Sequence, residues 1–370
     1  MIDQHWARRA VRVGCASLAA VPLIAFAQSP APAGPLDWRS ANDNVGRFER
    51  GHIDVLKWES ANPATQAAAA AAAPARDFNL PTADDAVRQA WRMHRDLALP
   101  LARIGPDSAN AIAAGQLLAI EPALQRQVND LDEVLAVASD ARKAWLKAVA
   151  ARAVLQHRRN ALTAAEAANE LGLRMVSTGN WSRLQQSEVK LAQLSAQANL
   201  TRAEYAATRT EAQLIAALQL DGVHTAVGVP DQLPPMPDQI ISEDEFTQRL
   251  AALHAHSPGA ERRRSAAAAP VVFSAYRAAQ AIATASADEA TVRGVIAEET
   301  VLHYNGMLKS VWDVLTTARG HAEATIAQIG TQRDFLIAET DLLWTLQGGM
   351  PTGLVSLDSN DNPGPASAAH

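Results

Sequence analysis

The fold of this chain is decided by a stretch that occurs in two related versions, GNWSRLQQSEVKLAQLSAQANLTRAEYAATRTEAQLIAALQLDG (179–222) and GMLKSVWDVLTTARGHAEATIAQIGTQRDFLIAETDLLWTLQGG (306–349). Each version opens with a glycine after a helical run, contains no proline, and closes on Leu-Gln followed by glycine. Glycine inside a helical pattern marks a turn or a close backbone approach. Each half is therefore predicted to hold two long helices joined by a glycine turn, and the chain to be a tandem duplication.

A seven-residue repeat of apolar side chains runs along both stretches. In the first stretch it consists of Leu184, Leu191, Ala198, Tyr205 and Ala212. In the second it consists of Leu308, Leu315, Ala322, Ile329, Leu336 and Leu343. A strict repeat of seven implies helices that supercoil on their neighbours. The sequence thus predicts an all-α fold of long antiparallel coiled helical hairpins in two tandem repeats.

The two halves also begin alike. Thr82 with Asp85, and Ser242 with Glu245, have the spacing of a helix N-cap, and prolines just upstream stop any earlier helix from continuing. The expected segments are a first helical repeat at 79–222, an inter-repeat linker at 223–237, a second helical repeat at 238–349 and a disordered tail at 350–370.

The start of the chain has the features of a secretory signal. Three arginines precede a mostly apolar stretch at 13–26, and Ala25-Phe26-Ala27 fits the small-x-small cleavage pattern. We expect a signal peptide at 1–27, then an N-terminal arm with an Ala/Pro-rich linker at 28–78. The one cysteine, Cys15, would leave with the signal, so the exported protein would hold no disulfide. Lipid anchoring at Cys15 and a twin-arginine signal at Arg8 and Arg9 are the alternatives.

Composition narrows the class of protein. Charged residues are 19% and aromatic residues 5% of the chain, so alanine supplies much of the 48% that is apolar. Alanine is the best helix former and lets helices approach closely. The net charge of −6 gives no reason to expect nucleic-acid binding. No segment after the signal reaches the roughly 18 continuous apolar residues of a membrane-spanning helix, and no nucleophile, phosphate or dinucleotide motif predicts an enzyme.

Metal binding has one weak candidate in the sequence. His254 and His256 are the only close histidine pair, and residues two apart on a helix do not face each other. Ordinary polar surface positions explain the pair better than a metal site does. We therefore expect neither a metal nor another cofactor.

Three stretches resemble the TolC family of outer-membrane efflux proteins. AEAANELGLRMVSTGNWSRL (165–184) and YNGMLKSVWDVL (304–315) resemble its hairpin turns, and RDFLIAETDLLWTLQGG (333–349) resembles the helix that ends its second repeat. The resemblance covers roughly 79–349. It implies a homotrimer whose hairpins form a periplasmic tube, fed by inner-membrane pumps through periplasmic adaptors.

The same resemblance assigns roles to residues at the two turns. Gly179, Asn180 and Trp181 would form one partner-binding tip, and Gly306 and Met307 the other. Tyr304 and Asp313 resemble positions that help to close the tip as a gate. The first-half counterpart of Asp313 is not acidic, since Arg183 and Gln185 occupy that neighbourhood, and Tyr304 stands one residue closer to its glycine than in the family's pattern. These departures weaken the expectation of a symmetric gate.

One larger departure concerns the membrane. In the family each half inserts a β-hairpin, and a transmembrane strand needs about 9–11 residues of alternating character. Neither 92–130 nor 254–300 offers such a strand. We therefore expect a TolC-like protein without a transmembrane β-barrel, in the periplasm with or without association with the outer membrane, and with at most indirect membrane contact.

Three functional hypotheses follow. The first is a TolC-like efflux-family component of an export complex, whose hairpin tips contact a periplasmic adaptor or other envelope protein. The second is a soluble periplasmic helical scaffold or a metal-resistance binding protein without transport activity. The third is a metal-binding or sensing bundle.

Overall fold

The computed structural model describes residues 78–120, 128, 130–255, 260–351 and 353–357. All of them belong to one compact unit, residues 75–370. The predicted signal peptide, the N-terminal arm up to residue 77 and the end of the predicted tail from 358 lie outside the described residues.

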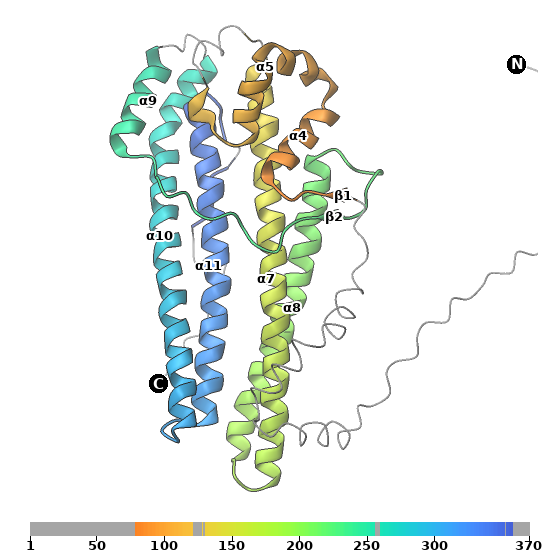
Figure 1. Cartoon of the computed structure of the whole chain (residues 1–370), viewed down its shortest axis with the longest axis vertical. Coiled ribbons are helices and arrows are strands. Elements are labelled where there is room, and N and C mark those ends of the chain that lie inside the picture. The colour runs from red at the N-terminus through yellow and green to blue at the C-terminus, as the bar shows by residue number, and fades with distance from the viewer. Residues whose placement is uncertain (1–77, 121–127, 129, 256–259, 352, 358–370) are drawn as a thin grey trace, which may run out of the picture. The chain divides into compact units, whose positions relative to one another are not determined.

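Two long antiparallel helical hairpins make up most of this unit (Figure 1). The first pairs α7 (Leu131–Ser177) with α8 (Arg183–Ala217), and the second pairs α10 (Ala260–Asn305) with α11 (Val311–Leu346). Their helices are 47 and 35 residues long in the first hairpin and 46 and 36 in the second. The predicted all-α fold of long antiparallel hairpins is confirmed. None of the described helices has the length and apolar character needed to cross a membrane.

The four long helices lie side by side in the order α10, α11, α7, α8. The two hairpins therefore meet along α11 and α7, and we call this contact the seam. Helices α8 and α10 form the two edges of the row. Each edge helix packs along its length on its own hairpin partner, which leaves one of its sides without a long-helix neighbour among the described elements.

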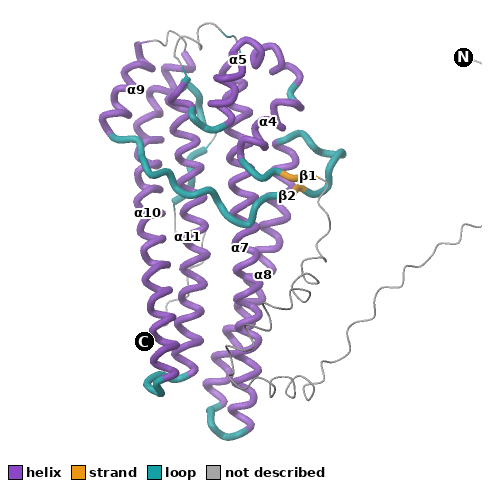
Figure 2. The backbone as a smooth tube through the Cα atoms, viewed as in Figure 1, coloured by secondary structure: helices purple, strands orange, loops and turns teal. Residues whose placement is uncertain are grey.

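Shorter elements surround one end of the row (Figure 2). In chain order they are β1 (Phe78–Asn79), α4 (Ala83–Met93), η1 (Arg95–Leu97), α5 (Ala98–Ala113), η2 (Leu117–Ala119), β2 (Val227–Gly228) and α9 (Glu243–Ala255). The two short strands pair in parallel, Phe78 with Val227 and Asn79 with Gly228. This pairing ties the start of the first half to the linker between the halves.

The predicted helix starts are present. Thr82 and Asp85 form a complete capping box at the start of α4, and the Glu245 backbone N–H donates to Ser242 Oγ at 3.1 Å before α9. Such caps satisfy backbone N–H groups that have no partner inside the helix. Of the predicted tail, Val355 and Leu357 lie partly buried against the core.

Buried aromatic residues fix the shorter elements to the row. Trp91 Nε1 donates to the Val134 carbonyl at 3.1 Å, and Trp145 Nε1 donates to the Leu80 carbonyl at 3.0 Å, so α4 and the strand before it are held on α7. A buried indole that keeps its hydrogen bond contributes both area and direction. On the other hairpin, a series of ring contacts from α9 through α10 to α11 joins Phe246, Phe273, Tyr276 and Phe335.

Two ion pairs cross the seam. Lys143 Nζ lies 3.0 Å from Asp341 Oδ1, and the two side chains are only 12% and 2% exposed. Burial raises the pKa of the Asp341 carboxyl, and the Lys143 charge opposes that rise. Farther along the seam, Arg158 Nη1 lies 2.6 Å from Glu323. Because breaking one partner of a buried pair leaves an uncompensated charge, both pairs fix the register of α7 on α11.

The structure corrects the expected use of the seven-residue repeats. In α11, Leu336 is buried and Leu315, Ala322, Ile329 and Leu343 are partly buried, so that stripe packs within the chain. In α8 all five members of the predicted stripe are exposed. A different stripe on α8, with Val189, Ala203 and Thr210 at its buried positions, faces α7. The α11 stripe therefore packs within the chain from Leu315 onward, with Leu308 exposed in the turn before it, whereas the stripe singled out on α8 is turned away from α7.

The seam also carries a histidine whose titration affects stability. Burial first, and the neighbouring His321 second, lower the pKa of His157 from its ordinary value of 6.5. A histidine with a lowered pKa in the folded chain binds its proton more weakly there than in the unfolded chain. Its contribution to stability is therefore lost as the pH falls through the unfolded value.

We predict that the thermal midpoint falls less in His157→Gln than in the wild type when the pH is lowered from about 7.5 to about 5.5. Thermal unfolding followed by circular dichroism measures both. The control is His303→Gln, which changes an exposed histidine in the last turn of α10 and should leave the pH dependence as in the wild type. Equal losses in His157→Gln and wild type would contradict the prediction.

Candidate functional site

The turn between α7 and α8 closes through backbone hydrogen bonds. Gly179 has a φ of 77°, a left-handed conformation that glycine adopts without cost. The N–H groups of Thr178, Gly179 and Asn180 donate back into the last turn of α7, at 3.2, 3.0 and 2.9 Å. Ser182 and Gln185 then form a capping box that starts α8. The sequence prediction of a glycine turn at this position matches the geometry.

The turn between α10 and α11 has the same backbone pattern with a different residue at its centre. The N–H groups of Gly306, Met307 and Leu308 donate into the last turn of α10 at 3.0, 2.9 and 2.8 Å. The left-handed residue here is Met307, with a φ of 61°. Gly306 corresponds in position to Thr178. The glycine that the sequence analysis placed at the turn is therefore not the residue with a positive φ, which is Met307.

The two tips present different surfaces. At the second tip the Met307 and Leu308 side chains are 94% and 76% exposed. At the first tip the exposed residues are small or polar, Gly179 and Asn180 among them. A large apolar side chain held in a left-handed turn and almost wholly in water is unusual for a monomer. The second tip is therefore the more apolar of the two predicted contact points.

Trp181 packs within the chain. Its ring lies against Gly172 of α7, where an added Cβ would be 3.2 Å from the indole. It also meets Trp312 at the start of α11 edge to face, with ring centroids 6.0 Å apart. This aromatic pair joins the first tip to the second hairpin. Packing within the chain explains its position, and part of the ring stays exposed.

The predicted gate residues lie on either side of the second turn. Tyr304 is exposed in the last turn of α10. The Asp313 carboxylate accepts hydrogen bonds from the backbone N–H and the hydroxyl of Ser310, at 2.9 and 2.7 Å. The Ser310 bonds, with a smaller effect of Lys309, lower the pKa of Asp313. Gln185 takes the same capping place in the first half. Asp313 thus has a structural role in this chain, and its part in a gate remains a prediction.

The histidine pair adds no site. His254 lies in the last turn of α9, and His256 lies outside the described residues. Within the described part of the chain, no group of three or more His, Cys, Asp or Glu side chains is placed to hold a metal ion.

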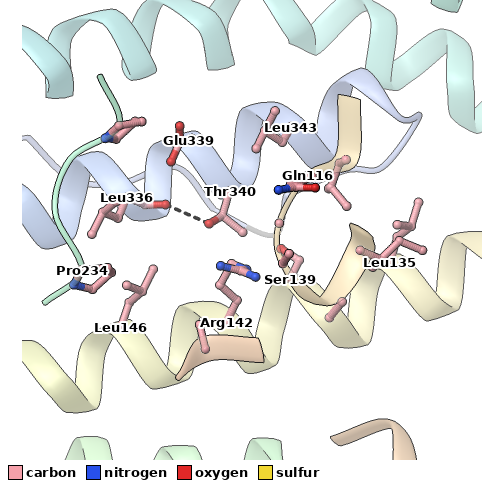
Figure 3. A pocket seen from close by; sticks show the side chains of 17 residues that line it. Gln116, Leu135, Ser139, Arg142, Leu146, Pro234, Leu336, Glu339, Thr340 and Leu343 are labelled. Atoms are coloured by element: carbon pink, nitrogen blue, oxygen red, sulfur yellow. Dashed lines mark hydrogen bonds between the residues drawn. The ribbon is translucent and has the colours of Figure 1, made fainter. Parts of the chain in front are cut away.

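Sequence reasoning missed a pocket of about 310 Å³ beside the seam (Figure 3). Its walls come from α7, α11, the turn between α5 and η2, and the inter-repeat linker. Its polar lining includes Ser139 and Arg142 from α7 and Glu339 from α11. Nothing in the sequence pattern indicated this pocket, because Arg142 and Glu339 are far apart along the chain and line one pocket only when α7 packs on α11.

The conformation at the first tip gives a stability prediction. Gly179→Ala should lower the free energy of unfolding by about 1 kcal/mol, because alanine is strained at a positive φ. No atom lies within 4 Å of the added Cβ, so strain alone is tested. The control is Gly330→Ala inside α11, which also meets no atom within 4 Å. It should raise stability by about 0.5–1 kcal/mol through helix propensity. Urea unfolding measures both changes, and effects of the same sign would contradict the assignment.

By sequence alone, neither a protein-family model nor a curated protein matches the chain. Solved structures with a related arrangement do match. A membrane protein from Pseudomonas aeruginosa is 17% identical, with 65% of this chain and 71% of that one covered and a TM-score of 0.46. The outer-membrane channel CmeC of Campylobacter jejuni is 11% identical, with 68% and 69% covered and a TM-score of 0.43. The outer-membrane channel OprN is 11% identical, with 65% and 70% covered and a TM-score of 0.46.

Two of these three solved structures are outer-membrane channels. The arrangement itself, two long antiparallel hairpins joined along α11 and α7, rests on the chain's own helices.

Proposed function

We propose that this chain is a cell-envelope component of a TolC-like export complex. Copies of the chain associate through their edge helices α8 and α10. The hairpin tips around Gly179, Asn180 and Trp181 and around Gly306 and Met307 contact a periplasmic adaptor or another envelope protein. The proposed location is the periplasm, with or without association with the outer membrane.

The exposed stripe on α8 carries the proposal. Leu184, Leu191 and Tyr205 are 70%, 66% and 68% exposed, and Ala198 and Ala212 continue the line at the same spacing. The stripe faces away from α7, because the buried positions of α8 lie on its other side. A sustained seven-residue repeat is typical of a helix that packs on another helix. A long apolar line left in water favours association.

The opposite edge of the row offers a matching surface. Val271, Ala278, Ala285 and Val292 recur every seventh residue on α10, and all four are exposed. The two stripes lie on different helices, so joining α8 of one copy to α10 of the next is a head-to-tail contact. Head-to-tail contacts close into a ring when the rotation permits. The TolC-like resemblance supports a ring of three.

The second tip supports a partner contact. Met307 and Leu308 lie in the turn between α10 and α11, and both side chains are exposed. Exposed large apolar residues gathered at one end of a rod are suited to a protein contact. Their position in the turn leaves the second tip accessible after copies have joined along their edges.

We predict that the mature chain forms oligomers and that Leu191→Glu shifts them toward monomer, because a carboxylate would be buried without a partner between helices. Light scattering coupled to size exclusion, over a dilution series, measures the mass. The expected effect is at least a tenfold rise in the concentration at which half of the chains are assembled.

The matched control is Gln197→Glu, which adds the same charge at an exposed position about 120° around α8 from the stripe. It should assemble like the wild type. Val292→Glu on α10 should weaken assembly as Leu191→Glu does. The edge-to-edge arrangement would be contradicted if the wild-type chain were monomeric at every concentration. It would also be contradicted if Leu191→Glu, Gln197→Glu and Val292→Glu changed assembly equally.

The tip contact has its own test in cells. A photo-activated cross-linking residue placed at position 307 should form an adduct with a periplasmic adaptor or another envelope protein, identified by mass spectrometry. The same residue at position 288, exposed midway along α10, should not form that adduct. Adducts at 307 that contain only further copies of this chain would show that the tip is not a partner-binding site.

A further inference from the structure

The pocket beside the seam has walls of two kinds. Most of its lining is aliphatic, with Ile112, Leu117, Leu135, Leu146, Leu336 and Leu343 among the lining side chains. The polar side chains come from α7 (Ser139, Arg142), from α11 (Glu339, Thr340) and from the turn before η2 (Gln116). Figure 3 shows Arg142 and Ser139 reaching from α7 toward Thr340 on α11. A volume of about 310 Å³ is at the small end of known ligand sites. The pocket therefore suits a small molecule that is largely hydrocarbon.

The positive charge in the wall is already compensated. Arg142 Nη2 donates to the Ala113 carbonyl and lies 3.4 Å from Asp84 Oδ1. Its guanidinium rests on Gly115, where an added Cβ would be 2.9 Å from Cζ. Arg142 is thus held against the wall by a carbonyl and a carboxylate. The next cation along α7, Lys143, is paired with Asp341.

Two oxygen-bearing side chains in the lining make no hydrogen bond among the described residues. Glu339 makes no hydrogen bond and no ion pair within 4 Å among the described residues, and burial raises the pKa of its carboxyl while Arg142 opposes the rise. Ser139 is only 4% exposed, and its hydroxyl has no hydrogen-bond partner in the described chain. Burying the Ser139 hydroxyl without a partner costs free energy that a bound ligand can recover.

The charged side chains of the pocket wall determine whether a ligand should carry a positive or a negative charge. Arg142 and Asp84 offset each other, and so do Lys143 and Asp341. Glu339 is the charged side chain of the lining that belongs to neither pair. A ligand with one positive charge and N–H donors would supply what both Glu339 and Ser139 lack, whereas an anion would meet an arginine that is already engaged and a carboxylate that repels it.

We propose that this pocket binds a small amphipathic amine, whose ammonium group pairs with the Glu339 carboxylate and whose hydrocarbon part occupies the leucine-lined remainder. The Ser139 hydroxyl supplies a further polar contact. The site is distinct from the hairpin tips and from the edge stripes, so it does not depend on the proposed role in export.

The test uses the chain without its predicted signal peptide (28–370). It compares three probes with the same carbon skeleton: hexylamine, hexanol and hexanoic acid. Isothermal titration and thermal shift at about pH 7.5 should rank hexylamine first. Glu339→Gln keeps the shape and removes the charge, so it should weaken hexylamine binding at least tenfold and leave hexanol within about twofold. The control Glu298→Gln removes a carboxylate on exposed α10 surface and should change neither.

A second variant covers the case in which Glu339→Gln does not fold. Leu343→Trp narrows the apolar part of the pocket and should weaken hexylamine and hexanol alike. The proposal is overturned if hexanol binds as well as hexylamine, if hexanoic acid binds best, or if none of the three probes binds the wild-type chain. It is also overturned if Glu298→Gln weakens hexylamine as much as Glu339→Gln does.

Discussion

The packing of α7 on α11 is the contact on which the rest of the structure depends. Each hairpin is closed within itself only by its turn and by the packing of its own two helices, which are rich in alanine and bury little area per residue. The seam adds two ion pairs, Lys143 with Asp341 and Arg158 with Glu323, and the Trp181–Trp312 contact near the tips. These polar and aromatic contacts are directional, so they set the register that apolar packing alone would leave loose.

Glycines allow neighbouring segments within each hairpin to approach closely at defined places. Gly172 lies under the Trp181 ring, and Gly294 of α10 lies under His321 of α11. In both cases an added Cβ would stand 3.2 Å from the ring, closer than ordinary van der Waals contact. In each case a glycine on a helix makes room for a ring from the neighbouring segment. This contact fixes the position along the helix axis, whereas alanine packed on alanine would allow the helices to slide.

The sequence predicts much of this fold, and the failures have physical causes. The first turn at Gly179 and the caps at Thr82 and Ser242 follow from local chemistry, so they could be predicted directly. Met307 could not be placed, because a non-glycine residue at positive φ leaves no mark in the sequence. A seven-residue period identifies a coiled helix but not which of its stripes faces inward, since Val189, Ala203 and Thr210 keep the same spacing as Leu184 and Leu191. The pocket could not be predicted, because Arg142 and Glu339 come to line it together only through tertiary packing.

The two kinds of surface on the long helices are segregated. Charged contacts between the hairpins lie in the seam, where Lys143, Arg158, Asp341 and Glu323 are paired. The stripes on the edge helices α8 and α10 consist of aliphatic, alanine and tyrosine side chains. Association along those edges would bury apolar area without breaking an ion pair, and would not alter the register set by the seam. A row of helices with a polar interior contact and apolar edges can therefore add copies sideways while the pocket beside α7 and α11 keeps its shape.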